Sequence, residues 1–238
     1  MRRPVLIAIG AALPALLVAA AQAAVCPADH DKLEKALKAS VKPSGGPTNG
    51  GLDNNEWAAL VIRDGAVCAV AFSGGKPDDQ WLGSRAIAAE KANTANALSL
   101  NGFALSTANL YAGSQPGGAL YGLALSAPPN PAVLYSGDPT KFGSTSDPFV
   151  GKSLGGLGVS GDTSCADHNI AWRVRRALGL DKVPAGVGPD HNDEIIYDLA
   201  PDKSSASGYG HALCKDKDPE IAEQIHAGFV PRWAKVTK

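Results

Sequence analysis

Residues 151–172 constrain the fold of this 238-residue chain more than any other stretch. A glycine-rich apolar run turns polar near Ser160, and apolar residues then recur at helical spacing. This order predicts a strand, a tight turn and an amphipathic helix. Ser164 and Asp167 stand at capping-box spacing, and Gly179 follows the expected helix end. The glycines let another backbone or a flat ligand approach the strand closely.

The same stretch contains the letters of a dinucleotide-binding fingerprint, with glycines at Gly156, Gly158 and Gly161. The first two of these glycines lie within the apolar run, whereas the fingerprint places them after a strand. No second strand with an acidic residue follows at the required distance. The pattern therefore favours a packed strand-to-helix corner over a phosphate site.

The chain begins with the features of a secretory signal peptide. Arg2 and Arg3 form a basic start, residues 5–20 are apolar, and Ala-Gln-Ala over 21–23 is a cleavage site of the A-x-A kind. We therefore expect a signal peptide over 1–23. The mature protein would be periplasmic or secreted, with no membrane attachment after cleavage.

Four cysteines would survive this cleavage. An even number in an exported protein indicates two disulfides, for which three pairings exist. We favour Cys26–Cys68 and Cys165–Cys214, because each would tie a flanking segment to the core. No two cysteines have C-x-x-C spacing, which argues against a zinc or iron–sulfur site.

Hydrophobic periodicity and turn residues predict the remaining elements. They are a helix over 27–40, a hairpin of strands 57–62 and 67–72 with a type I′ turn at Asp64-Gly65, a helix over 80–100, a short helix over 106–113, and strands over 119–125 and 132–135. These elements predict an α/β (α+β) single domain with a mainly antiparallel sheet of about five strands flanked by helices.

After Gly179 the sequence becomes polar and rich in turn residues. We expect residues 181–238 to form an extension packed on the domain and pinned through Cys214, with a possible strand over 194–199 and a short helix over 219–226. The formal net charge of −1 gives no electrostatic support for nucleic-acid binding.

Two motifs in this order resemble a known family. The closing motif spans residues 155–171: it begins Gly-Gly-Leu-Gly-Val-Ser-Gly-Asp-Thr and continues into a helix with Asp167 and Ala171. The earlier motif runs from Ser84-Arg85-Ala86 to Lys91-Ala92-Asn93-Thr94-Ala95. Both are similar to signatures of the GlcG/HbpS-like heme-binding family. The resemblance spans about 29–180. It implies a domain over 24–180, a profilin-like topology, frequent homo-oligomers and non-covalent heme, since the C-x-x-C-H attachment sequence is absent.

Heme needs an axial ligand, an apolar slot and cations for its propionates. The only methionine is Met1, so the candidate ligands are histidines or a tyrosine. His30 lies in the first expected helix, which in heme-binding relatives can supply the ligand. His168 lies in the helix of the closing motif, with Trp172 four residues later. The other histidines are His191, His211 and His226.

The resemblance also makes Arg85, Lys91 and Asp167 candidate cofactor-binding residues. Lys91 interrupts an apolar helix face, so it either lays its stem along the core or offers a cation to a carboxylate or propionate. The basic group Arg173, Arg175 and Arg176 could meet propionates, although such residues near a helix C-terminus are commonly a solvated face.

The sequence gives less support to a hydrolase or to a metal site than to heme binding. Ser160 does not stand in a G-x-S-x-G elbow. Asp190, His191, Asp193 and Glu194 could chelate a metal or simply be solvated. No residue is expected to be catalytic.

Three functions remain open. The first is an exported heme or tetrapyrrole-binding protein that acts as a carrier, scavenger or sensor accessory. The second is a periplasmic enzyme, or enzyme accessory, for a small hydroxy acid or alcohol, with Lys91 and Asp167 in a small polar pocket. The third is a structural oligomer whose pocket is vestigial.

Overall fold

The computed structural model describes residues 25–122, 132, 135–151 and 157–227. Its centre is a three-stranded antiparallel sheet in the order β2-β1-β3, formed by β1 (Trp57–Val61), β2 (Val67–Phe72) and β3 (Leu157–Ser160). The α-helices of the described residues are α1 (His30–Val41), α2 (Gly83–Leu98), α3 (Tyr111–Ser114), α6 (Ser164–Ala177) and α7 (Asp218–His226). Short 3₁₀ turns span Pro77–Asp79, Thr107–Leu110 and Pro139–Lys141.

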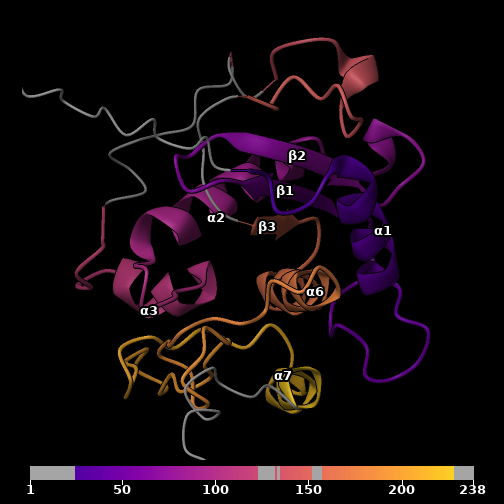
Figure 1. The fold of residues 1–238 in the computed structure, drawn as a ribbon. Coiled ribbons are helices and arrows are strands. Elements are labelled where there is room, and N and C mark those ends of the chain that lie inside the picture. Colours follow the sequence, from indigo (N-terminus) through magenta and orange to yellow (C-terminus); the bar gives the residue numbers. More distant parts are fainter. Residues whose placement is uncertain (1–24, 123–131, 133–134, 152–156, 228–238) are drawn as a thin grey trace, which may run out of the picture.

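The sheet is covered on both faces (Figure 1). Alternate residues of a strand point to opposite faces, so Ala58 and Leu60 pack toward α1 and α6, while Trp57 and Ala59 pack toward α2. All five residues of β1 are buried because this central strand has a helix layer on each side. The mixed α/β class and the antiparallel sheet are thereby confirmed.

The strand count differs from the expected five. Two further strands were expected over 119–125 and 132–135. Of these, residues 119–122 lie in turns, and residues 123–125 and 133–134 fall outside the described ranges. The expected signal peptide also falls outside those ranges. The expected strand over 194–199 is wrong, since only Leu199 forms an isolated bridge, with Ser205. The profilin-like topology stays a prediction.

The β1–β2 hairpin is confirmed, but its turn is not of type I′. A type I′ turn needs positive φ at both central residues, whereas Gly65 has φ 95° and Asp64 is not left-handed. Ile62 donates its N–H to Ala66 O at 3.0 Å, and Gly65 N–H donates to Ile62 O at 2.9 Å. The connection is therefore a three-residue loop ending in a left-handed glycine, the other common hairpin solution.

Helix α6 begins one residue earlier than its capping pattern predicts. Thr163, and not Ser164, is the N-cap, and its hydroxyl accepts the Ala166 N–H at 3.3 Å. At the other end Gly179 has φ 70° and donates to Arg176 O at 3.0 Å, while Leu180 N–H donates to Arg175 O at 2.8 Å. This is a Schellman motif, so the predicted role of Gly179 is confirmed.

The glycines of the closing motif serve backbone packing. A Cβ on Gly158 would lie 1.8 Å from Ala88 O of α2, and one on Gly161 would lie 2.2 Å from Asn55 O. These contacts need the bare backbone of glycine. They support a packed strand-to-helix corner in place of a phosphate cradle.

The C-terminal segment lies against α6, which separates it from the sheet (Figure 1). Ile195 and Ala222 form a small apolar cluster with Ala108 and Cys165. Both favoured disulfides, Cys26–Cys68 and Cys165–Cys214, are confirmed. Among the described helices, none is both long enough and apolar enough to cross a bilayer.

Candidate functional site

His30 is the first residue of α1, directly after the N-cap Asp29. Its ring is half-buried, and Nδ1 lies 2.8 Å from the backbone oxygen of Val70 on β2. A carbonyl oxygen can only accept, so Nδ1 must carry the proton of this bond. In the neutral ring the lone pair is therefore on Nε2.

His168 has the opposite arrangement. Its Nε2 accepts the backbone N–H of Ile195 at 3.1 Å, so in the neutral ring Nδ1 carries the proton. The pKa of His168 is lowered well below its usual value, first by burial and then by the nearby His226, although part of its surface remains exposed. The ring would be free to bind a metal through Nε2 only if the segment carrying Ile195 moved away.

The remaining histidines lie in the extension. His211 Nδ1 is 2.7 Å from Ala212 O, and its ring lies 4.7 Å from that of Tyr111. His226 packs on Trp172 at 4.2 Å between ring centroids, and its Nδ1 is 3.1 Å from Glu194 Oε2. These contacts tie both rings to the fold.

Lys91 and Asp167 meet although they are 76 residues apart in sequence. Lys91 Nζ donates to Asp167 Oδ2 at 2.5 Å and to Val159 O at 3.2 Å, and its side chain is 26% exposed. The other Asp167 oxygen accepts the Asp162 N–H at 3.0 Å. Burial raises the pKa of Asp167, and the charge of Lys91 opposes that rise. Lys91 thus combines both proposed behaviours, because its stem is partly buried and its ammonium holds a carboxylate.

Glu56 joins this pair and was not predicted from the sequence. Its side chain is fully buried, and neither carboxyl oxygen has a hydrogen-bond partner within the described residues. Burial raises the pKa of Glu56 to about 10, with the charges of Asp167 and Asp162 adding to the effect. Glu56 is therefore a neutral acid at neutral pH. The available signal was an acidic residue directly before six apolar ones.

Arg85 is held inside the core by its own chain. It donates to both carboxylate oxygens of Asp147, with Nε to Oδ2 at 2.9 Å. The guanidinium lies 4.1 Å from the ring centroid of Phe142 and 3.6 Å from that of Phe149. Asp147 and Phe149 flank Pro148. A propionate could reach Arg85 only if this ion pair opened, so that role stays a prediction.

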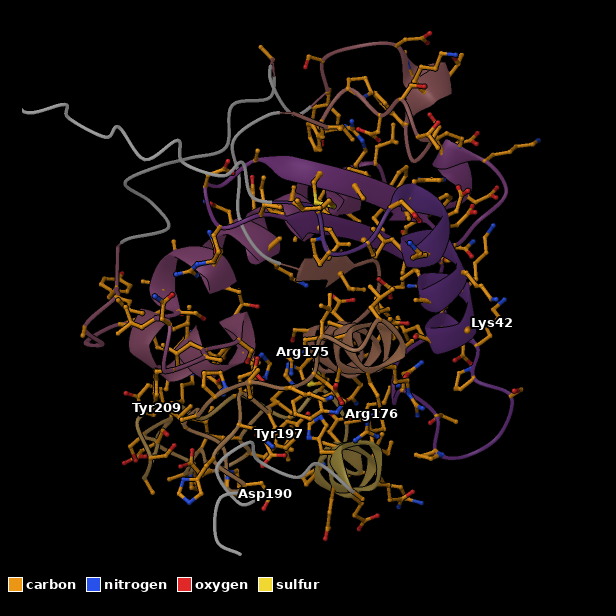
Figure 2. All side chains as sticks on the ribbon, viewed as in Figure 1. Lys42, Arg175, Arg176, Asp190, Tyr197 and Tyr209 are labelled. Atoms are coloured by element: carbon orange, nitrogen blue, oxygen red, sulfur yellow. A yellow bond between two sulfur atoms is a disulfide. The ribbon has the colours of Figure 1, made fainter. Side chains whose placement is uncertain are left out.

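The three arginines of α6 also bind within the chain. Arg173 Nε donates to Asn49 Oδ1 at 2.9 Å, and Arg176 lies 3.6 Å from Asp181. Arg175 pairs with both oxygens of Asp193 at 2.5 and 2.7 Å. Burial works to raise the pKa of Asp193, but the charge and hydrogen bonds of Arg175 outweigh it, so the pKa is lowered. Figure 2 labels Arg175 beside α6 and Arg176 between α6 and α7.

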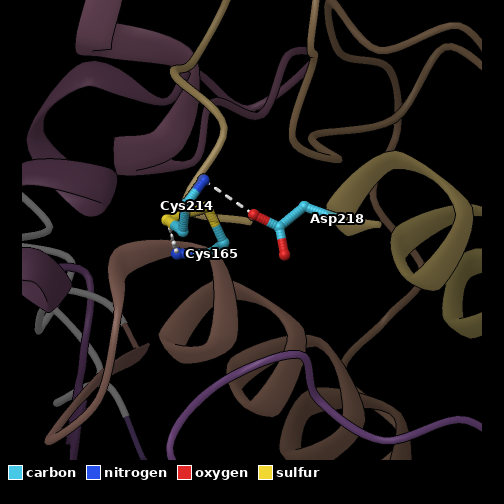
Figure 3. Close-up of side chains that lie close together, drawn as sticks. All are labelled: Cys165, Cys214 and Asp218. Carbon is cyan, nitrogen blue, oxygen red and sulfur yellow. Dashed lines mark hydrogen bonds between the residues drawn. A yellow bond between two sulfur atoms is a disulfide. The ribbon is translucent and has the colours of Figure 1, made fainter. Parts of the chain in front are cut away.

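Two of the acidic groups considered for metal binding are already engaged. Asp193 pairs with Arg175, and Glu194 faces His226. A second cluster contains Asp218 beside Cys165 and Cys214 (Figure 3). Its sulfurs form a disulfide, and Asp218 accepts the Cys214 N–H at 2.7 Å. Sulfurs joined to each other are not thiolate ligands, so this cluster holds the extension on α6.

A shallow hollow lies between the loop before β1 and α6. Its lining residues are Val41, Asn49, Gly51, Asp53, Asn54, Asp162 and Ile170, and it encloses ≈ 0 Å³. Small-molecule pockets commonly hold about 300–1,000 Å³. This hollow therefore has no room for a porphyrin.

Comparison with solved structures gives a distant likeness. No family model matches the chain, and no curated protein matches it. Among solved structures, the chain is similar to the crystal structure of Klebsiella pneumoniae protein ORFY, described under the family-model DUF336. The identity is 20%, the TM-score is 0.42, and the match covers 69% of this chain and 97% of that one.

Proposed function

We propose that this protein is an exported, non-covalent heme-binding protein in which Nε2 of His30 is the axial ligand. The observation that carries the proposal is the hydrogen bond from His30 Nδ1 to Val70 O at 2.8 Å. Metal-ligating histidines commonly donate their second ring nitrogen to a carbonyl or carboxylate, which fixes the tautomer and the ring orientation. His30 has this arrangement before any iron is present.

Two further features support the proposal. The two sequence motifs stand in the order of the GlcG/HbpS-like family, and two disulfides are compatible with an extracellular or periplasmic protein. A carrier, a scavenger or a sensor accessory would all need reversible, non-covalent heme. The proposal assigns His168 no iron, because its Nε2 already accepts a hydrogen bond.

The apolar walls for the porphyrin must lie beside His30. This residue is half-buried at the junction of α1 and β2, and the hollow beside α6 encloses no space. We therefore assign the second wall to another copy of this chain, so the proposal includes a homo-oligomer. Sedimentation velocity with and without hemin tests this part: heme should travel with an oligomer, and heme bound to a monomer would contradict it.

The test of the ligand is a hemin titration of the mature, oxidised protein, followed in the Soret region. We expect saturable binding that falls at least about tenfold in His30→Ala, the loss of about 1.4 kcal/mol of binding free energy. The matched variant His168→Ala should bind as the wild type does. Unchanged affinity in His30→Ala, or no saturable binding by the wild type, would overturn the proposal.

A second candidate function is supported by the Glu56, Lys91 and Asp167 cluster. Groups with displaced pKa values gather at catalytic sites, and here a neutral acid stands beside a carboxylate and an ammonium. We propose, as the alternative, proton-transfer chemistry on a small hydroxy acid or alcohol. A screen of such compounds should then find turnover that Glu56→Gln and Lys91→Met abolish. Turnover that survives both substitutions would contradict this alternative.

A further inference from the structure

We propose that Lys91 and Asp167 react with each other to form an intramolecular amide bond, with the buried carboxyl group of Glu56 as the proton carrier. The product is a covalent link between α2 and α6, which the chain makes by itself with the loss of one water. The proposal goes beyond heme binding and does not depend on it. An amide would remove the ammonium and the carboxylate that the alternative proton-transfer function requires, so the two cannot both hold.

The two reacting groups are already in contact and come from different elements. Lys91 Nζ of α2 lies 2.5 Å from Asp167 Oδ2 of α6, although the two residues are 76 positions apart in the sequence. Lys91 Nζ also donates to Val159 O on β3 at 3.2 Å, which holds the nitrogen beside the carboxyl group. Groups held together in this way react as if they were present at very high concentration. The fold therefore supplies an encounter that is rare between free side chains in water.

The surroundings of the pair favour uncharged reactants. An amide forms from a neutral amine and a neutral acid, whereas an ammonium and a carboxylate do not react with each other. Asp167 is 4% exposed, and burial raises its pKa against the opposing charge of Lys91. Because burial penalises charged forms, it favours transfer of one proton from Nζ to Oδ2 along their hydrogen bond, which neutralises both groups at once. The Lys91 side chain is 26% exposed, which gives the released water a way out.

Glu56 is the third component, and its role explains an otherwise costly burial. The residue is 0% exposed, and neither carboxyl oxygen has a hydrogen-bond partner within the described residues. A buried polar group without a partner costs stability and calls for an explanation. Burial raises the pKa of Glu56 to about 10; the charge of Asp167 adds to this rise and that of Lys91 opposes it. Glu56 is therefore a neutral acid close to both reacting groups.

The reaction balances without any other reactant. After the proton transfer, the lone pair of Lys91 Nζ attacks Asp167 Cγ and the C–N bond forms. Glu56 gives its proton to the departing Oδ2 hydroxyl and takes one proton from the nitrogen, so it ends as the acid that it was. The Cγ–Oδ2 bond breaks and one water leaves. Asp167 Oδ1 becomes the amide oxygen, and the Asp162 N–H, which donates to it at 3.0 Å, stabilises the charge that develops there.

Intact mass and peptide mapping of the purified, oxidised protein test the proposal. The mass should be lower by one water than the chain with its two disulfides requires. After reduction, alkylation and tryptic digestion, residues 86–141 should appear joined to residues 153–173, because trypsin does not cleave after an acylated Lys91. Absence of this linked peptide from the wild type would overturn the proposal. A lost water that maps to another peptide in its place would overturn it as well.

Glu56→Gln tests the proton carrier, because it keeps the size of the side chain and both reacting groups but cannot exchange protons in the same way. It should lack the linked peptide, and near-UV circular dichroism checks that it is folded. Lys91→Arg keeps the positive charge and should also stay unlinked. If either variant fails to fold, the wild-type result still decides.

The exposed pair of Lys32 and Asp29 is a control within the same protein. Lys32 Nζ lies 2.8 Å from Asp29 Oδ2, but the two side chains are 68% and 60% exposed, and no buried acid is assigned to them. This pair should remain an ion pair without an amide bond. A link between Lys32 and Asp29, or a Lys91–Asp167 link that persists in Glu56→Gln, would overturn the role assigned to burial and to Glu56.

Discussion

Glu56 illustrates how a single buried carboxyl group makes stability depend on pH. Its pKa is raised from 4.5 to about 10 on folding, so the folded protein favours the protonated acid. The stability that this proton binding contributes to the folded state is fully present below pH 4.5, and it is lost as the pH rises from 4.5 toward 10. Glu56→Gln, which is neutral at every pH, should therefore gain stability relative to the wild type as the pH rises.

Chemical denaturation at pH 4 and pH 8 measures this gain. We expect Glu56→Gln to be no more stable than the wild type at pH 4, and more stable by about 1–3 kcal/mol at pH 8. Glu223→Gln, at an exposed position of α7, is the matched control and should show no such change. A constant difference between Glu56→Gln and the wild type at both pH values would contradict the assignment.

His168 has a pH dependence of the opposite direction. Its pKa is lowered below the ordinary 6.5, so folding favours the neutral ring. The stabilisation is present above pH 6.5 and is lost as the pH falls below that value, at up to about 1.4 kcal/mol per pH unit. His168→Gln should remove this slope between pH 6.5 and 5, measured by urea unfolding. The same slope in the variant and the wild type would show that another group is responsible.

At the scale of elements, Gly158 sets the distance between β3 and α2. A Cβ at this position would lie 1.8 Å from Ala88 O and 2.7 Å from Ala92 N, both backbone atoms that cannot rotate away. Gly158→Ala should therefore destabilise the protein by about 3 kcal/mol or more. Gly102→Ala is the matched control, because a Cβ on Gly102 would meet no atom within 4 Å. Thermal unfolding of Gly158→Ala and Gly102→Ala tests this prediction. Equal melting temperatures for the two variants would contradict this role of Gly158.

Local sequence patterns predicted most elements because each pattern reports burial along one segment. The β1–β2 hairpin and helices α1, α2 and α6 follow directly from such periodicity. The predicted turn type was wrong, and the predicted α6 N-cap was wrong by one residue. Asp64-Gly65 suits more than one hairpin loop, and Thr163 and Ser164 both carry a hydroxyl that can cap a helix.

Contacts between distant segments could not be predicted in the same way. Lys91 and Asp167 were both singled out, but their ion pair depends on how α2 and α6 meet across β3. Arg85 stands in a recognisable motif, yet its Asp147 partner lies in a polar loop 62 residues later. Glu56 resembles an ordinary solvated residue next to a strand, and only the folded chain buries it near Asp167 and Asp162.

At the scale of the whole molecule, the described residues form three layers with a C-terminal segment added against α6, and the two disulfides join different pairs of segments. Cys165–Cys214 fixes the added segment to α6, where the Ile195 N–H donates a hydrogen bond to His168 Nε2. Cys26–Cys68 fixes the start of α1 to β2, where His30 Nδ1 donates to Val70 O and Nε2 of the neutral ring carries the lone pair. The two histidines suggested by the sequence are thus distinguished by what the rest of the chain packs against them.

Rescue of axial ligation by free imidazole tests the central claim most directly. The variant His30→Gly removes the ring and leaves space for a small ligand at the start of α1. With hemin bound to the wild type, His30→Gly should lack the wild-type Soret spectrum, and added imidazole should restore it. A variant that shows the wild-type spectrum before any imidazole is added would contradict His30 as the ligand.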